Sequence, residues 1–155
     1  MAFHTQSCGD CSLCCTLLGV SSIGKPPNQH CPHCPTGKGG CQIYDRQPKQ
    51  CGGFECGYLT APIAVQFRPD NIHFIITGED RKLRCQFIDV DPKFPHATET
   101  PNGRYLIGMM RAGGYRDIVV TTGGAHRVIS DSPARAAILI HELEKRQQAA
   151  QPTSG

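Results

Sequence analysis

Nine of the ten cysteines in this sequence lie between Cys8 and Cys56, and only Cys85 lies beyond that stretch. The first group has the spacing C-x2-C-x2-C-C and consists of Cys8, Cys11, Cys14 and Cys15. The second group consists of Cys31, Cys34, Cys41, Cys51 and Cys56. Thiolates bind zinc and iron–sulfur clusters in preference to magnesium or calcium. The sequence therefore predicts a metal site built from these nine cysteines, whereas Cys85, inside a strand pattern, is expected to be a small buried hydrophobic residue.

The choice between zinc and iron is left open by the motifs. A tetrahedral zinc ion takes four nitrogen or sulfur ligands, so the nine cysteines, with His30 and His33 nearby, could fill two such sites. A [4Fe–4S] cluster also takes four thiolates, and C-x2-C-x2-C is a spacing found in ferredoxins. The ferredoxin match is partial, because here the fourth cysteine follows the third directly.

A helix over the first motif would arrange its thiols in a useful way. On a helix that runs from Cys8 to about Leu18, the side chains of Cys8, Cys11 and Cys15 fall within about 60° of one another. Cys14 points about 100° away from Cys15 and would reach a neighbouring site or pack inward. A loop or cap at Gly9 and Asp10 would loosen this grouping.

Three other functions fit parts of the cysteine pattern. An iron–sulfur protein with a redox or electron-transfer role would use the same thiolates, and a zinc-ribbon-like module would bind another macromolecule. The sequence Cys31-Pro32-His33-Cys34 also has the C-x-x-C spacing of thiol–disulfide oxidoreductases. That activity requires a strand before the motif and a helix after it. Residues 26–29 and 35–40 are instead rich in proline and glycine, which disfavours the oxidoreductase.

The remaining composition excludes several partners. The formal net charge is +3 and no run of Lys or Arg stands out, so nucleic-acid binding is not predicted. No apolar run approaches the roughly 20 residues that span a bilayer, and the first seven residues lack the pattern of a signal peptide. We therefore expect a cytoplasmic protein with no membrane partner, in which clustered cysteines are ligands rather than disulfides. A metal ion is the partner that the sequence predicts, and the sequence does not decide whether the protein is an enzyme.

The elements that must position the cysteines change in character near residue 60. Residues 1–60 contain many glycines and prolines and little periodic hydrophobicity, so we expect a loop-rich lobe stapled by metal. Residues 61–150 are expected to form an α+β part packed on that lobe, with a small, mostly antiparallel sheet and a C-terminal helix. Residues 151–155 are expected to be a disordered tail. Strands are predicted at 63–67, 72–77, 85–90, 104–110, 117–122 and 125–129, and Ser132 and Pro133 predict the start of the last helix.

In order along the chain, these motifs resemble the bacterial YkgJ-type cysteine-cluster family, whose members are described as zinc- or iron-chelating proteins. Beyond the first motif, the matching residues are Cys31, Cys34, Cys41-Gln42-Ile43-Tyr44, Cys51, Phe54, Cys56 and Gly57-Tyr58-Leu59. Gln47-Pro48 stands where the family has an Arg-Pro pair, and Arg46 is displaced from it by one residue. The resemblance covers about residues 8–59 and implies metal chelation by a cytoplasmic bacterial protein, without a defined activity.

Overall fold

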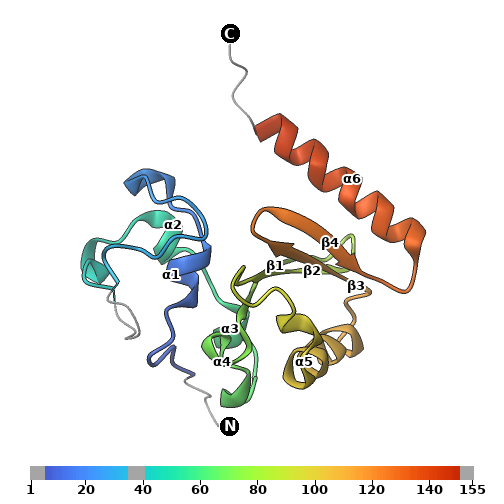
Figure 1. Cartoon of the computed structure of the whole chain (residues 1–155), viewed down its shortest axis with the longest axis horizontal. Helices are drawn as coiled ribbons and strands as arrows, with labels where there is room; N and C mark the ends of the chain where they lie inside the picture. The colour runs from blue at the N-terminus through green and yellow to red at the C-terminus, as the bar shows by residue number, and fades with distance from the viewer. Residues whose placement is uncertain (1–5, 35–40, 151–155) are drawn as a thin grey trace.

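The computed structural model describes residues 6–34 and 41–150, and a four-stranded sheet lies at its centre (Figure 1). The strands β1 (Phe74–Asp80), β2 (Cys85–Val90), β3 (Asp117–Thr122) and β4 (Ala125–Ile129) lie side by side in that order. β1 pairs antiparallel with β2, and β3 pairs antiparallel with β4, whereas β2 and β3 are parallel. The predicted α+β class is confirmed, and the parallel central pair makes the sheet mixed. The strands predicted at 85–90, 117–122 and 125–129 are present with those bounds.

The parallel central pair exists because a helix connects β2 to β3. The segment predicted as a strand at 104–110 lies within α5 (Pro101–Ala112), which follows the short helix η4 (Ala97–Glu99), so that prediction is wrong. The buried residues of α5 include Leu106, Ile107 and Met110, whose spacing places them on one helical face. Thr100 supplies the missed start signal, since its hydroxyl accepts a hydrogen bond from the Gly103 amide at 3.1 Å.

Replacing either of two glycines in α5 with alanine should change the free energy of unfolding in opposite directions. A Cβ added at Gly103 would lie 2.2 Å from the Ala97 carbonyl oxygen, whereas one added at Gly108 would meet nothing within 4 Å. We expect Gly103→Ala to destabilise the protein by about 1–3 kcal/mol through overpacking. Gly108→Ala should instead stabilise it by about 0.5–1 kcal/mol, because alanine loses less backbone entropy in a helix. Urea unfolding of the two variants tests this, and the same sign for both would contradict the described packing of α5.

Two other predicted strands differ from the structure near Pro69. Residues 63–67 contain the short helix η3 (Val65–Phe67), and residue 72 is the last residue of α4 (Pro69–Ile72). Proline is well suited to the first helical position, which favours a helical turn at Pro69. His73 then adopts a left-handed conformation with φ of 61°, which ends α4 and lets β1 begin at Phe74. A short run of apolar residues is therefore not sufficient evidence for a strand in this part of the chain.

The sheet is covered on both faces (Figure 1). The C-terminal helix α6 (Pro133–Ala150) packs on one face, where Leu139 contacts a cluster with Cys85 and Val119. The other face carries the main core, which includes Phe74, Ile118 and residues of α5. The predicted start of α6 is confirmed, because the Ser132 hydroxyl accepts a hydrogen bond from the Arg135 amide at 3.2 Å. None of the helices in residues 6–34 and 41–150 combines the length and the apolar character needed to cross a membrane.

The carboxyl group of Asp89, on the α6 side of the sheet, should make the stability of the protein depend on pH. Asp89 is half-buried in β2, and burial raises its pKa from 3.8 to about 6. The native state therefore keeps this proton to higher pH than the unfolded chain, and the free energy of unfolding should fall as pH rises from about 4 to about 6. We expect Asp89→Asn to raise the melting temperature more at pH 8 than at pH 4. Thermal melts at the two pH values measure this, and an equal effect at both would contradict it.

The N-terminal part lies beside the sheet and consists of short helices joined by loops (Figure 1). Its elements are α1 (Leu13–Leu17), η1 (Ser21–Ile23), η2 (Tyr44–Arg46), α2 (Lys49–Gly52) and α3 (Gly57–Thr60). We call residues 6–34 and 41–56 the cysteine lobe. Up to residue 55, its buried residues among those described are Leu17, Val20, Lys25 and Cys34. Cys56 and Tyr58 belong to the main core under the sheet, so they attach the lobe to the α+β part.

Candidate metal centre

The first cysteine motif is divided between a turn and a helix. The Cys11 amide donates to the Cys8 carbonyl at 2.9 Å, and Gly9 between them adopts a left-handed φ of 52°. Because α1 begins at Leu13, only Cys14 and Cys15 of the motif are helical. The helix considered from Cys8 therefore does not form, and the alternative of a turn at Gly9 and Asp10 is observed, so Cys8, Cys11 and Cys15 do not share a helical face. Glycine tolerates the left-handed conformation that such a turn requires.

Cys14 is the residue that connects the thiols. The side chains of Cys14 and Cys15 are hydrogen-bonded, which lowers the pKa of Cys14 to about 7 and raises the pKa of Cys15. Cys15 also has a side-chain hydrogen bond with Cys34 of the second motif. Four further cysteines lie close enough to Cys14 to interact with it electrostatically, namely Cys8, Cys11, Cys51 and Cys56. The two motifs therefore meet around Cys14.

The other cysteines of the second motif join this group through Cys51. Cys51 interacts electrostatically with Cys31 and Cys41, and the Cys31 amide donates to the Cys15 carbonyl at 2.9 Å. Partial burial is the main cause that raises the pKa of Cys8, Cys51 and Cys56, and it raises that of Cys11 to about 11. The cysteines of the two motifs are thus linked by hydrogen bonds or electrostatic interactions, and we call them the thiol group; these links make them neighbours, not ligands of one ion.

Cys85 lies apart from the thiol group. It is 0% exposed in β2, packed with Val119 and Leu139 between the sheet and α6. Burial raises its pKa, and the charged groups that act on it are Asp80, Asp117 and Arg146 rather than other cysteines. Its environment is that of a small core residue.

The thiol group supplies the right donors without holding them in a finished site. Among the described residues, no three His, Cys, Asp or Glu side chains converge as ligands of one ion. Zinc requires sulfur or nitrogen ligands at about 2.0–2.3 Å in a tetrahedron. In kind and number the cysteines fit zinc or an iron–sulfur cluster, and binding would require several thiols to turn toward a common point.

A buried lysine lies among the thiols. Lys25 is 6% exposed, and its ammonium donates to the carbonyls of Thr16 at 3.3 Å, Pro26 at 3.2 Å and Leu18. Burial lowers its pKa, while the neighbouring cysteines Cys31, Cys15, Cys51 and Cys14 oppose that shift. A fixed positive charge here favours the thiolate forms that metal binding needs. The sequence offers no signal for this role, because a lysine in a Gly- and Pro-rich loop normally faces solvent.

His30 supports the second motif through both ring nitrogens. Its Nε2 bonds the Cys34 carbonyl at 2.8 Å, and its Nδ1 bonds the Thr16 hydroxyl at 2.8 Å. Since a carbonyl oxygen can only accept, Nε2 carries the proton, and in the neutral ring Nδ1 accepts from Thr16. His33 contributes through its backbone, whose carbonyl accepts from the Gln42 amide at 2.8 Å. The ring of His30 therefore has structural partners on both nitrogens, and the donors that contact Cys14 are sulfur atoms.

Arg68 and Asp70 hold the first motif against the α+β part. The Arg68 guanidinium donates two hydrogen bonds to Asp70, at 2.6 and 2.7 Å, which lowers the pKa of that carboxyl group. Asp70 also has a side-chain hydrogen bond with Cys11. A Cβ added at Gly9 would lie 2.9 Å from the Arg68 guanidinium, so the turn packs closely on this ion pair. No sequence motif indicates this contact, because residues 68–70 lie far along the chain from Cys11.

The C-x-x-C segment does not have the surroundings of a redox motif. Cys31 to Cys34 form a turn in which the Cys34 amide donates to the Cys31 carbonyl at 3.1 Å. The segment 35–40 that follows lies outside the described residues. The observed turn, together with the contact between Cys34 and Cys15, places this motif in the thiol group rather than at the end of a strand.

The fold and the thiol group together define an α+β chain with a cysteine-rich lobe beside a mixed sheet. Comparison with protein-family models, curated proteins and solved structures finds no match to this chain. The case for its function therefore rests on the residues described above.

Proposed function

We propose that this protein binds zinc or iron through the cysteines of its N-terminal lobe. The bound metal is structural or serves storage, delivery or sensing. The observation that carries the proposal is the hydrogen-bonded set Cys14, Cys15 and Cys34, which joins the two motifs and interacts electrostatically with further cysteines of the lobe, whereas Cys85 packs apart between the sheet and α6. The resemblance of residues 8–59 to the YkgJ-type cluster proteins belongs to the same proposal, as does a reducing, cytoplasmic setting.

The composition of the lobe supports a stabilising role for the metal. Leu17 and Val20 are its buried aliphatic side chains up to residue 55, among the residues described. Burying one such side chain contributes about 1.5–3 kcal/mol, whereas ordering each residue of the chain opposes folding by about 1–2 kcal/mol. A metal ion bound by several thiolates joins distant segments, and small metal-binding domains commonly depend on it for folding.

The residues of the proposed site have different roles. Cys14, Cys15 and Cys34 form the hydrogen-bonded centre of the proposed site. Lys25 balances part of the negative charge that the thiolates develop, and His30 fixes the backbone at Cys34. A bound ion would hold these segments in one arrangement.

An iron–sulfur protein with a redox or electron-transfer role is the second candidate. It is favoured by the sulfur-only donors around Cys14, because both ring nitrogens of His30 have other partners and four thiolates suit a [4Fe–4S] cluster as well as zinc. An absorption spectrum of protein purified without oxygen distinguishes the two. A brown protein that dithionite bleaches indicates the cluster. A colourless protein that releases its metal to a thiol-modifying reagent indicates zinc.

A further inference from the structure

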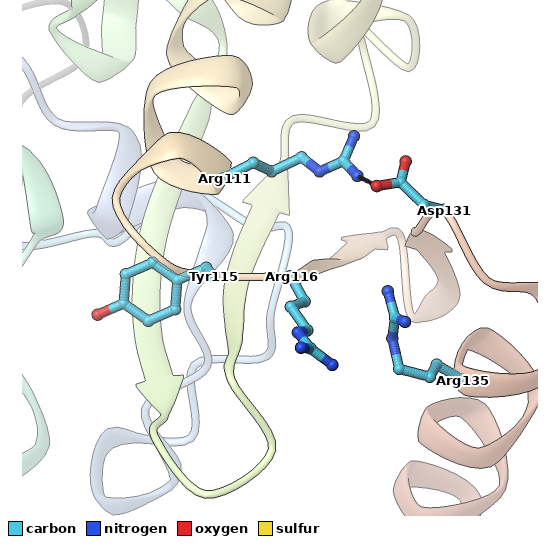
Figure 2. A pocket seen from close by; sticks show the side chains of 5 residues that line it. All are labelled: Arg111, Tyr115, Arg116, Asp131 and Arg135. Atoms are coloured by element: carbon cyan, nitrogen blue, oxygen red, sulfur yellow. Dashed lines mark ion pairs between the residues drawn. The ribbon is translucent and has the colours of Figure 1, made fainter.

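A pocket rich in arginine lies between the end of α5, the start of β3 and the start of α6 (Figure 2). Its volume is about 510 Å³, within the range of small-molecule sites. The residues that line it are Arg111, Tyr115, Arg116, Asp131 and Arg135. None of them belongs to the cysteine lobe, so the pocket is independent of the proposed metal site.

The three guanidinium groups of the pocket differ in how they are paired. Arg135 is held by two hydrogen bonds to Asp117, at 3.1 and 3.3 Å, and the Asp117 side chain is only 2% exposed. Arg111 pairs with Asp131 at 2.5 Å, and the Asp131 side chain is 80% exposed. Among the described residues, the guanidinium of Arg116 has no hydrogen-bond or ion-pair partner, and Figure 2 shows it directed toward Arg135. The pocket therefore has one fixed, one exchangeable and one unpaired cation.

The charges indicate which ligand would fit. Three arginines against the carboxylates of Asp117 and Asp131 leave a charge of +1. An ion pair with so exposed a carboxylate is weak, so a ligand can displace Asp131 from Arg111. Three arginines against Asp117 alone then leave +2, which matches a phosphate dianion better than a single carboxylate. The positive end of the α6 dipole at Pro133 adds to the same field.

We propose that this pocket binds the phosphate group of a small phosphorylated ligand. Arg116, beside Arg135, contacts the phosphate oxygens, and Arg111 turns toward them from the other side of the pocket when it leaves Asp131, since a guanidinium group can donate two parallel hydrogen bonds to phosphate. Asp117 is a positioning residue that keeps Arg135 in place, and Asp131 occupies Arg111 until the ligand arrives. The volume leaves room for the organic part of a phosphate ester. The ring of Tyr115 points away from the guanidinium groups and packs on the main core.

An NMR titration of the full chain, with its metal, tests the proposal. Inorganic phosphate and phenyl phosphate are added in turn, and the side-chain N–H signals of the arginines are followed. We expect saturable shifts at the pocket arginines with both, tighter binding of phenyl phosphate, and affinity for acetate at least about tenfold weaker. No saturable shift, equal affinity for acetate, or shifts confined to the cysteine lobe would overturn the proposal.

Three variants complete the test, and each changes an exposed residue. Arg116→Gln should weaken phosphate binding by about tenfold or more, because it removes a charge-assisted contact. Asp131→Asn should strengthen it by about threefold or more, because the competing carboxylate is lost. Arg81→Gln removes the same charge on the β1–β2 turn, where Arg81 pairs with Glu79, and should change the affinity less than about twofold. Equal effects of Arg116→Gln and Arg81→Gln, or weaker binding by Asp131→Asn, would contradict the assignment.

Discussion

Replacing Cys14 with serine is expected to remove most of the bound metal and to loosen the cysteine lobe. Cys14 interacts with Cys15 and with cysteines of both motifs, so its replacement removes the thiol that links the two motifs. A serine hydroxyl stays protonated at neutral pH and cannot replace a thiolate. Even loss of a residue that only supports a ligand typically weakens metal binding by about 10–100-fold, so we expect at least that loss here. Metal content after dialysis and hydrogen exchange of the lobe amides measure the two effects.

Cys85→Ser is the matched control for this experiment. Cys85 is fully buried between the sheet and α6, so a hydroxyl there should lower the free energy of unfolding by about 1–3 kcal/mol. The metal content of the Cys85→Ser variant should equal that of the unchanged protein. The Cys15→Ser variant should instead lose metal as Cys14→Ser does. Equal metal loss in the Cys14 and Cys85 variants, or no loss in either, would show that the thiol group around Cys14 is not the metal site.

Removing the metal with a chelator is expected to unfold the cysteine lobe and leave the sheet intact. The lobe has little apolar core of its own, whereas Phe74, Ile118 and Val120 of the sheet are 0% exposed. Thiolate-bound zinc contributes about 10–16 kcal/mol to the folding of small zinc domains. Loss of even about 4 kcal/mol would reduce amide protection in the lobe by about a thousandfold.

Hydrogen exchange followed residue by residue distinguishes this local unfolding from a global one. The amides of Leu18 and Cys31, which bond to carbonyls of Cys14 and Cys15, should lose protection in the metal-free protein. Amides within β2 and β3 should keep theirs. If protection falls equally in the lobe and the sheet, or in neither, the metal does not act as the staple of the lobe.

The fold could be predicted from the sequence where one signal dominates. The pairing of Ser132 with Pro133 fixed the start of α6, and Gly123-Gly124 with φ of 57° and 87° forms the turn expected between β3 and β4. Prediction failed in 104–110, where short apolar runs suit either a strand or a helix. Thr100 followed by Pro101 is the same kind of helix start as Ser132 with Pro133, so this segment carries a usable signal that the apolar run at 104–110 obscures.

The sequence nominates the cysteines of the candidate site but does not predict how they are arranged. The spacing of the cysteines identifies nine thiols as a group and sets Cys85 apart, because ligand motifs are local in sequence. The contact of Cys15 with Cys34 depends on how the intervening loop folds back, and this loop brings Lys25 under α1. The contact of Cys11 with Asp70 joins residues from different parts of the fold. Spacing along the chain carries no information about such pairs.

Metal binding by the cysteine lobe is tested most directly by the metal content of the full chain, purified without oxygen from cells supplied with iron and zinc. Elemental analysis and titration of the reactive thiols are carried out on the same native sample. We expect at least about one metal ion per chain, with the cysteines of the lobe protected from the thiol reagent until the metal is removed. Less than about half a metal ion per chain, with all ten thiols freely reactive, would contradict it.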